Sequence, residues 1–257
     1  MNLPLGGLIA LLVSFFPFLL VQRWLHQELE AFFLLITRSS EIAIGLFALL
    51  FFPGVLLHEL SHFLMAKILL VRTANFSMIP QAKADGSIQL GYVSVRRVDK
   101  LRDALIGLAP LISGGLVVAA LGSWKVGLAD VFPILMMGDL AGFMEGPAAL
   151  PQLPDFWLWF YLTFVISSTM LPSKSDRQAW LPVVLVLGGI LLLAFVAGAG
   201  PWMMQYVAPS LNRSLGAVAM VFGISLVIHI GLIIPLWGLN QVIGRLTGYK
   251  IIRQSQR

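Results

Sequence analysis

Six apolar runs dominate the sequence, and they approach or reach the length of about 20 residues that a helix needs to cross a bilayer. Only 11% of the residues are charged, whereas a soluble domain carries about 25%. We therefore predict an all-α polytopic membrane protein with about six transmembrane helices in a single membrane domain, 1–257. The predicted spans are 3–21, 41–71, 104–122, 156–171, 180–207 and 215–243.

Two segments between these runs have a mixed character. Residues 23–40 form a partly amphipathic link between the first two spans. Residues 131–150 are broken by glycine and proline and contain Asp139 and Glu145. Polar backbone at membrane depth is tolerated only where protein or water surrounds it, so we predict a re-entrant or surface segment here.

Lysine and arginine gather in the 72–103 connection, at 174–177 and after 245. Cytoplasmic loops of membrane proteins are enriched in these residues, so we predict that these regions and both termini lie in the cytoplasm. The net charge of +5 comes largely from these segments. The sequence has no basic stripe with interleaved aromatic residues, which argues against nucleic acid as a partner.

The 72–103 connection also carries a pattern typical of strands. Residues 75–80 and 87–95 are β-like, and Asp85-Gly86 between them is a hairpin turn signal. We predict a small cytoplasmic or membrane-associated β-hairpin between the second and third spans. It either completes a loop or offers an edge strand that holds a peptide in extended form.

The second span contains the motif His58-Glu59-Leu60-Ser61-His62. Histidines at positions i and i+4 lie on one helical face, where both imidazoles reach a single metal ion. Glu59 lies on the same turn, where it can act as general base toward an activated water. Ionisable residues cost about 2.5–3.5 kcal/mol each at the centre of a bilayer, so such a cluster indicates function.

A catalytic zinc site needs a third protein ligand and an open position. The chain has no cysteine, so the ligands must be nitrogen or oxygen donors. We favour Asp176, which follows the fourth span on the predicted side of the histidines; the alternative is an ordinary loop acid. His229, deep in the last run, is expected to be a buried, hydrogen-bonded core residue.

The chain resembles the site-2 protease family, zinc metalloproteases that cleave within membranes. The resemblance rests on the histidine motif inside an apolar run and on a later proline turn followed by an aspartate, Pro172 and Asp176. The family commonly has asparagine three residues before that proline, where this chain has Thr169.

The resemblance implies a Zn²⁺ site formed by His58, His62 and Asp176, with Glu59 as the catalytic residue. It also implies a three-helix catalytic core over 41–176, with additional spans in 1–40 and 177–257. The expected partner is a membrane-protein substrate with a transmembrane segment. The chain looks like a divergent prokaryotic member, which implies a bacterial or archaeal cell membrane and an active site toward the cytoplasm.

Two other functions compete with this interpretation. A non-proteolytic scaffold would bind transmembrane helices, but it needs no general base at Glu59. An ion-coupled transporter scatters ionisable groups over several spans and shows internal repeats, whereas the sequence concentrates its motif at one depth.

Overall fold

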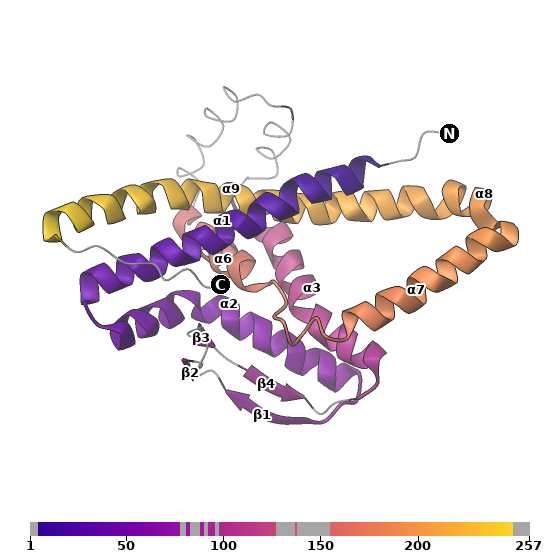
Figure 1. Cartoon of the computed structure of the whole chain (residues 1–257), viewed down its shortest axis with the longest axis horizontal. Coiled ribbons are helices and arrows are strands. Elements are labelled where there is room, and N and C mark those ends of the chain that lie inside the picture. Colours follow the sequence, from indigo (N-terminus) through magenta and orange to yellow (C-terminus); the bar gives the residue numbers. More distant parts are fainter. Residues whose placement is uncertain are drawn as a thin grey trace.

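The computed structural model describes residues 5–77, 81–82, 88–89, 92–95, 98–126, 137 and 155–248, and helices dominate it (Figure 1). The N-terminal helices are α1 (Gly6–Thr37) and α2 (Ser40–Ile68). Four short strands follow: β1 (Thr73–Ser77), β2 (Gln81–Ala82), β3 (Ile88–Gln89) and β4 (Tyr92–Val95). The later helices are α3 (Lys100–Trp124), α6 (Phe156–Thr169), α7 (Trp180–Ala194), α8 (Gly200–Trp202) and α9 (Ala208–Thr247).

Within the described residues, four helical stretches are long and apolar enough to cross a membrane. They are α1, α2, α3 and the run Trp180–Thr247, which takes in α7 to α9. Helix α6 is apolar but has only 14 residues. The chain is therefore a predominantly helical membrane protein, as its composition predicts.

Helices α2, α3 and α6 pack together and agree closely with the second, third and fourth predicted spans. Small residues permit the close approach of these helices, as is common inside membranes. A Cβ added at Gly54 would overlap the Val165 carbonyl oxygen and the Thr169 hydroxyl, and one at Gly114 would meet the Met170 side chain. The glycines of α2 and α3 therefore bring α6 into contact with both.

Helix α1 is longer than the first predicted span. It continues without interruption through the residues predicted to be a link, because its buried face continues with Leu25, Glu28, Ala31 and Leu35. The predicted helix end near Val21 is wrong. The polar residues of this segment favour a link between two spans, although one of them, Glu28, is buried in a helix contact.

Helices α1 and α9 lie side by side and run parallel (Figure 1). The Gly7 amide donates to Asn212 Oδ1 at 2.6 Å, and Asn240 Nδ2 donates to the Glu28 carboxylate at 2.8 Å. Six alternating spans would make the first and last helices antiparallel. The parallel pair also puts the C-terminal end of α9 beside that of α1 and away from the C-terminal end of α2 (Figure 1). The sequence predicts that the C-terminus and the 72–103 connection, which follows α2, lie on one side, so the structure departs from the predicted topology.

The fifth predicted span is broken in the structure. Helix α7 ends at Ala194, and the chain then passes through π-helical turns at Phe195–Ala199 and Met203–Val207. Gly198 has φ of 91°, a left-handed value that glycine adopts without strain. Here the chain turns sharply at α8, so that α7 diverges from α9 (Figure 1).

The strands form two antiparallel pairs, β1 with β4 and β2 with β3. Strands β1 and β4 both contact α2 and lie beneath it in Figure 1. The predicted turn at Asp85-Gly86 and the predicted re-entrant segment at 131–150, apart from Met137, lie outside the described residues.

Candidate metal centre

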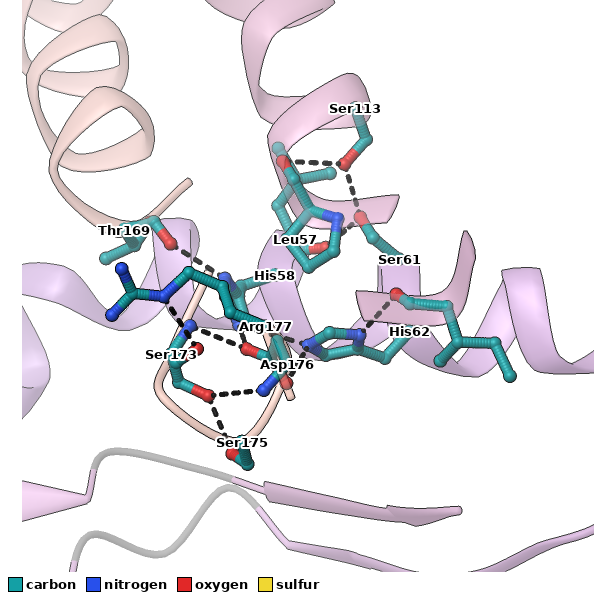
Figure 2. Close-up of polar contacts among 12 residues, drawn as sticks. Leu57, His58, Ser61, His62, Ser113, Thr169, Ser173, Ser175, Asp176 and Arg177 are labelled. Carbon is teal, nitrogen blue, oxygen red and sulfur yellow. Dashed lines mark hydrogen bonds and ion pairs between the residues drawn. The ribbon is translucent and has the colours of Figure 1, made fainter. Parts of the chain in front are cut away.

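Helix α2 presents His58 and His62 one turn apart on its inner face (Figure 2). Their Nε2 atoms lie 3.2 Å from each other. Asp176, in the loop between α6 and α7, brings Oδ1 to 3.5 Å from His62 Nε2 and Oδ2 to 3.9 Å from His58 Nε2. Among the described residues, these three form one group whose ligand atoms all lie within 4.8 Å of one another.

Each imidazole is held by a backbone carbonyl from a neighbouring helix. His58 Nδ1 lies 2.7 Å from the Thr169 carbonyl oxygen of α6, and His62 Nδ1 lies 2.8 Å from the Ile106 carbonyl oxygen of α3. A carbonyl oxygen only accepts, so both Nδ1 atoms must carry the proton. When the imidazoles are neutral, the lone pair of each Nε2 then faces the space beside Asp176. Metal-binding histidines commonly have this arrangement, in which a carbonyl accepts from one ring nitrogen and the other nitrogen binds the metal.

The Asp176 carboxylate is oriented by a reciprocal pair of hydrogen bonds with Ser173. The Ser173 amide donates to Asp176 Oδ2 at 2.7 Å, and the Asp176 amide donates to Ser173 Oγ at 3.3 Å. This is the capping-box arrangement of a serine followed three residues later by an acid. A Cβ at Gly107 would overlap the Asp176 carbonyl oxygen, so this glycine of α3 allows the loop to approach.

The charge of Asp176 is stabilised at this position. Burial by itself would raise the pKa of the carboxyl group, but the hydrogen bond and charge of His62, when that ring is protonated, and the hydrogen bonds from Ser173 outweigh it and lower the pKa to about 2. Asp176 is therefore a carboxylate at neutral pH, which is the form that binds a cation.

The donor set fits a zinc ion. Tetrahedral zinc with ligands at about 2.0–2.1 Å separates its ligand atoms by about 3.3 Å. The two Nε2 atoms lie 3.2 Å apart, and one Asp176 oxygen lies 3.5 Å from His62 Nε2 while the other lies 3.9 Å from His58 Nε2. Two imidazole nitrogens at 3.2 Å beside a carboxylate need a proton or a metal cation between them, and a divalent cation is the one that could bind all three groups at once. His58, His62 and Asp176 can thus supply three ligands and leave a fourth position open.

Two further residues of the α2 motif are buried. Glu59 is 8% exposed and follows His58 directly in the chain. The Ser61 hydroxyl oxygen lies 2.5 Å from the Leu57 carbonyl oxygen and 2.5 Å from the Ser113 hydroxyl oxygen of α3. The contact between Ser61 and Ser113 joins α2 to α3 next to the metal ligands.

His229 is fully buried in α9 and hydrogen-bonded, as expected for a core histidine. The structure does not bring it into the metal group. The two other acids considered from the sequence, Asp139 and Glu145, lie outside the described residues.

The sequence did not reveal the carbonyls of Thr169 and Ile106, because any residue type supplies a carbonyl oxygen. It did carry a signal for Ser173. The spacing of Ser173 and Asp176 matches the capping-box pattern, which predicts a fixed turn at the aspartate.

Comparison of the chain with protein-family models, with curated proteins and with solved structures finds no match.

Proposed function

We propose that the chain is an intramembrane zinc metalloprotease of the site-2 type, which hydrolyses a peptide bond in or next to a transmembrane segment of a membrane protein. The observation that carries the proposal is the convergence of His58 Nε2, His62 Nε2 and the Asp176 carboxylate within 4.8 Å, with both Nδ1 atoms held by carbonyls. A divalent cation would bind all three groups at once.

Bound zinc would supply a Lewis acid that polarises the scissile carbonyl and lowers the pKa of a water molecule toward 7. Glu59 is the residue that would accept a proton from the attacking water and deliver it to the nitrogen of the leaving amine. His58, His62 and Asp176 keep their positions through the reaction because backbone groups hold all three.

The strands beside α2 support a peptide substrate. A helical peptide hides its carbonyls in hydrogen bonds, so a protease needs its substrate extended. Strands β1 and β4 form a two-stranded ladder in contact with α2. An unwound substrate segment can add to an edge of this ladder as a further strand.

Basic residues beside the site favour a cytoplasmic orientation. Lys174 and Arg177 flank Asp176, and Lys100 and Arg102 begin α3 shortly before Ile106. Under the positive-inside rule these residues lie on the cytoplasmic side. A bacterial or archaeal cell membrane is what the resemblance to the site-2 protease family implies.

The central test is reconstitution of the purified chain with a single-span substrate. Glu59→Gln should retain bound zinc, because the ligands are unchanged, and should lower turnover by about 100-fold or more because the general base is lost. Metal content by mass spectrometry and cleavage by gel assay check both expectations.

Glu41→Gln is the matched control, since Glu41 is an exposed acid on the first turn of the same helix. It should retain both zinc and turnover. Undiminished cleavage by the Glu59 variant would show that the proposed mechanism is wrong. Zinc-loaded protein that cleaves no test substrate would favour the scaffold or transporter interpretation.

A further inference from the structure

The C-terminal end of α6 is the point where α1, α2 and α9 all make polar contacts. The last four carbonyls of a helix have no partner within the helix, and in a membrane water does not replace one. At this end of α6 the Thr169 carbonyl accepts from His58 of α2, and the Ser168 carbonyl accepts from Gln22 Nε2 of α1 at 2.6 Å. Side chains from two other helices thus cap α6.

Helix α9 holds the same turn through a side chain. His229 Nδ1 lies 2.6 Å from the Ser225 carbonyl oxygen, so this nitrogen carries the proton. His229 Nε2 is then an acceptor, and the Ser168 hydroxyl donates a hydrogen bond to it, with an Oγ to Nε2 distance of 2.9 Å. His229 is 0% exposed and Ser168 is 4% exposed, so water does not compete for this bond.

We propose that His229 and Gln22 are positioning residues for the metal ligand His58, which they hold through the last turn of α6. The inference rests on the proposed metal site. Ser168 is joined directly to Thr169, whose carbonyl oxygen fixes the ring of His58. Helix ends fray readily, and two side chains from α1 and α9 prevent this at the residue that orients the ligand.

The positioning role requires the acceptor nitrogen of His229 and not only the volume of its ring. If His229 merely filled space, a ring of similar size would replace it without consequence for the metal. If it positions His58, loss of its acceptor nitrogen lets the Thr169 carbonyl move and weakens metal binding. Loss of an outer partner of a metal ligand typically weakens affinity by about 10–100-fold.

The experiment measures Zn²⁺ and Co²⁺ affinity of the purified full chain in detergent, together with the Co²⁺ absorption spectrum and thermal unfolding without metal. His229→Phe, Gln22→Leu and Ser168→Ala should each weaken metal affinity by about 10–100-fold and alter the Co²⁺ bands. His229→Gln should restore much of the affinity, because its amide oxygen can accept from Ser168.

Two comparisons separate positioning from general stability. Ser14→Ala is the matched control, since Ser14 is a serine only 1% exposed whose hydroxyl donates within α1. It should leave metal affinity unchanged. The double variant Ser168→Ala/His229→Phe should bind metal about as weakly as either single variant, because both remove the same hydrogen bond.

Unchanged metal affinity in folded Ser168→Ala and His229→Phe would overturn the positioning role while leaving the proposed function intact. An equal loss in Ser14→Ala would also overturn it. Should His229→Phe fail to fold, Ser168→Ala and Gln22→Leu decide the matter. A wild-type chain that binds metal but cleaves nothing counts against the proposed function alone, and one that binds no metal counts against both.

Discussion

At the scale of single residues, the site depends on which nitrogen of each imidazole is free. Backbone carbonyls fix the protons of His58 and His62 on Nδ1, so both Nε2 lone pairs meet at 3.2 Å. Nitrogens this close need a proton or a metal cation between them. A divalent cation would replace the proton and join both imidazoles to the Asp176 carboxylate.

Metal removal should accordingly lower the thermal stability of the chain. A ligand present at about 1,000 times its Kd stabilises the folded state by about 4 kcal/mol. Chelation should lower the unfolding temperature and added Zn²⁺ should restore it, as followed by circular dichroism in detergent. In His62→Ala the same treatment should have little effect. An equal response in this variant would mean that the stabilising metal binds elsewhere.

Asp176→Asn tests the charge of the third ligand. Asparagine has nearly the same shape and its carbonyl can still accept from the Ser173 amide, but it provides no anion. Loss of a hydrogen-bond partner of a metal ligand already lowers metal affinity by about 10–100-fold. Loss of the charged ligand itself should therefore weaken Zn²⁺ affinity by more than about 100-fold. Competition with a fluorescent chelator gives the affinity. Wild-type affinity in this variant would remove Asp176 from the site.

At the scale of helices, the close contact of α2 with α6 sets the site. Gly54→Ala adds a methyl group that would overlap the Val165 carbonyl and the Thr169 hydroxyl. Overpacking of this kind costs about 1–3 kcal/mol, and the shift of α6 should draw the Thr169 carbonyl away from His58. We expect lower thermal stability and weaker metal binding, measured on the same sample.

Gly45→Ala is the matched control on α2, because a Cβ there meets nothing within 4 Å. It should retain metal affinity and gain slightly in helix stability, since alanine favours helices by about 1 kcal/mol over glycine. Equal behaviour of the two variants would contradict the packing argument.

The sequence predicts the helices of the core well and the polar contacts between them poorly. The spans over α2, α3 and α6 follow from continuous apolar runs, and the ligands on α2 follow from helical spacing. The contacts at the end of α6 depend on residues far apart in the chain. Gln22 meets Ser168 across 146 positions, and neither residue type announces the other. Such contacts become visible only when the fold is known.

At the scale of the whole molecule, the exposed apolar surface indicates lipid contact. No residue of α7 is buried within the chain, and leucines along it are 52–71% exposed. The parallel pairing of α1 and α9 was not predictable, because apolar runs define helices and leave their partners open. Glu28 and Asn240 specify that pair. From the sequence alone Glu28 is a polar residue of the predicted link, and Asn240 is one near the end of the last predicted span.

Cysteine labelling tests lipid contact directly, since the natural chain has no cysteine. A water-soluble maleimide should label Lys174→Cys in permeabilised vesicles and leave Leu191→Cys unlabelled, because Lys174 lies in an exposed loop and Leu191 lies on α7. Detergent with denaturant should allow the maleimide to label the cysteines at both positions. Rapid labelling at 191 in intact bilayers would contradict a lipid-facing α7.

The most direct measurement of the central claim is zinc-edge X-ray absorption on the purified chain. We predict one zinc per chain, with two imidazole nitrogens and oxygen donors at about 2.0–2.2 Å, and loss of that signal in folded His58→Ala. A chain that carries no zinc after metal-replete purification would contradict it, as would a zinc signal unchanged by the His58 substitution.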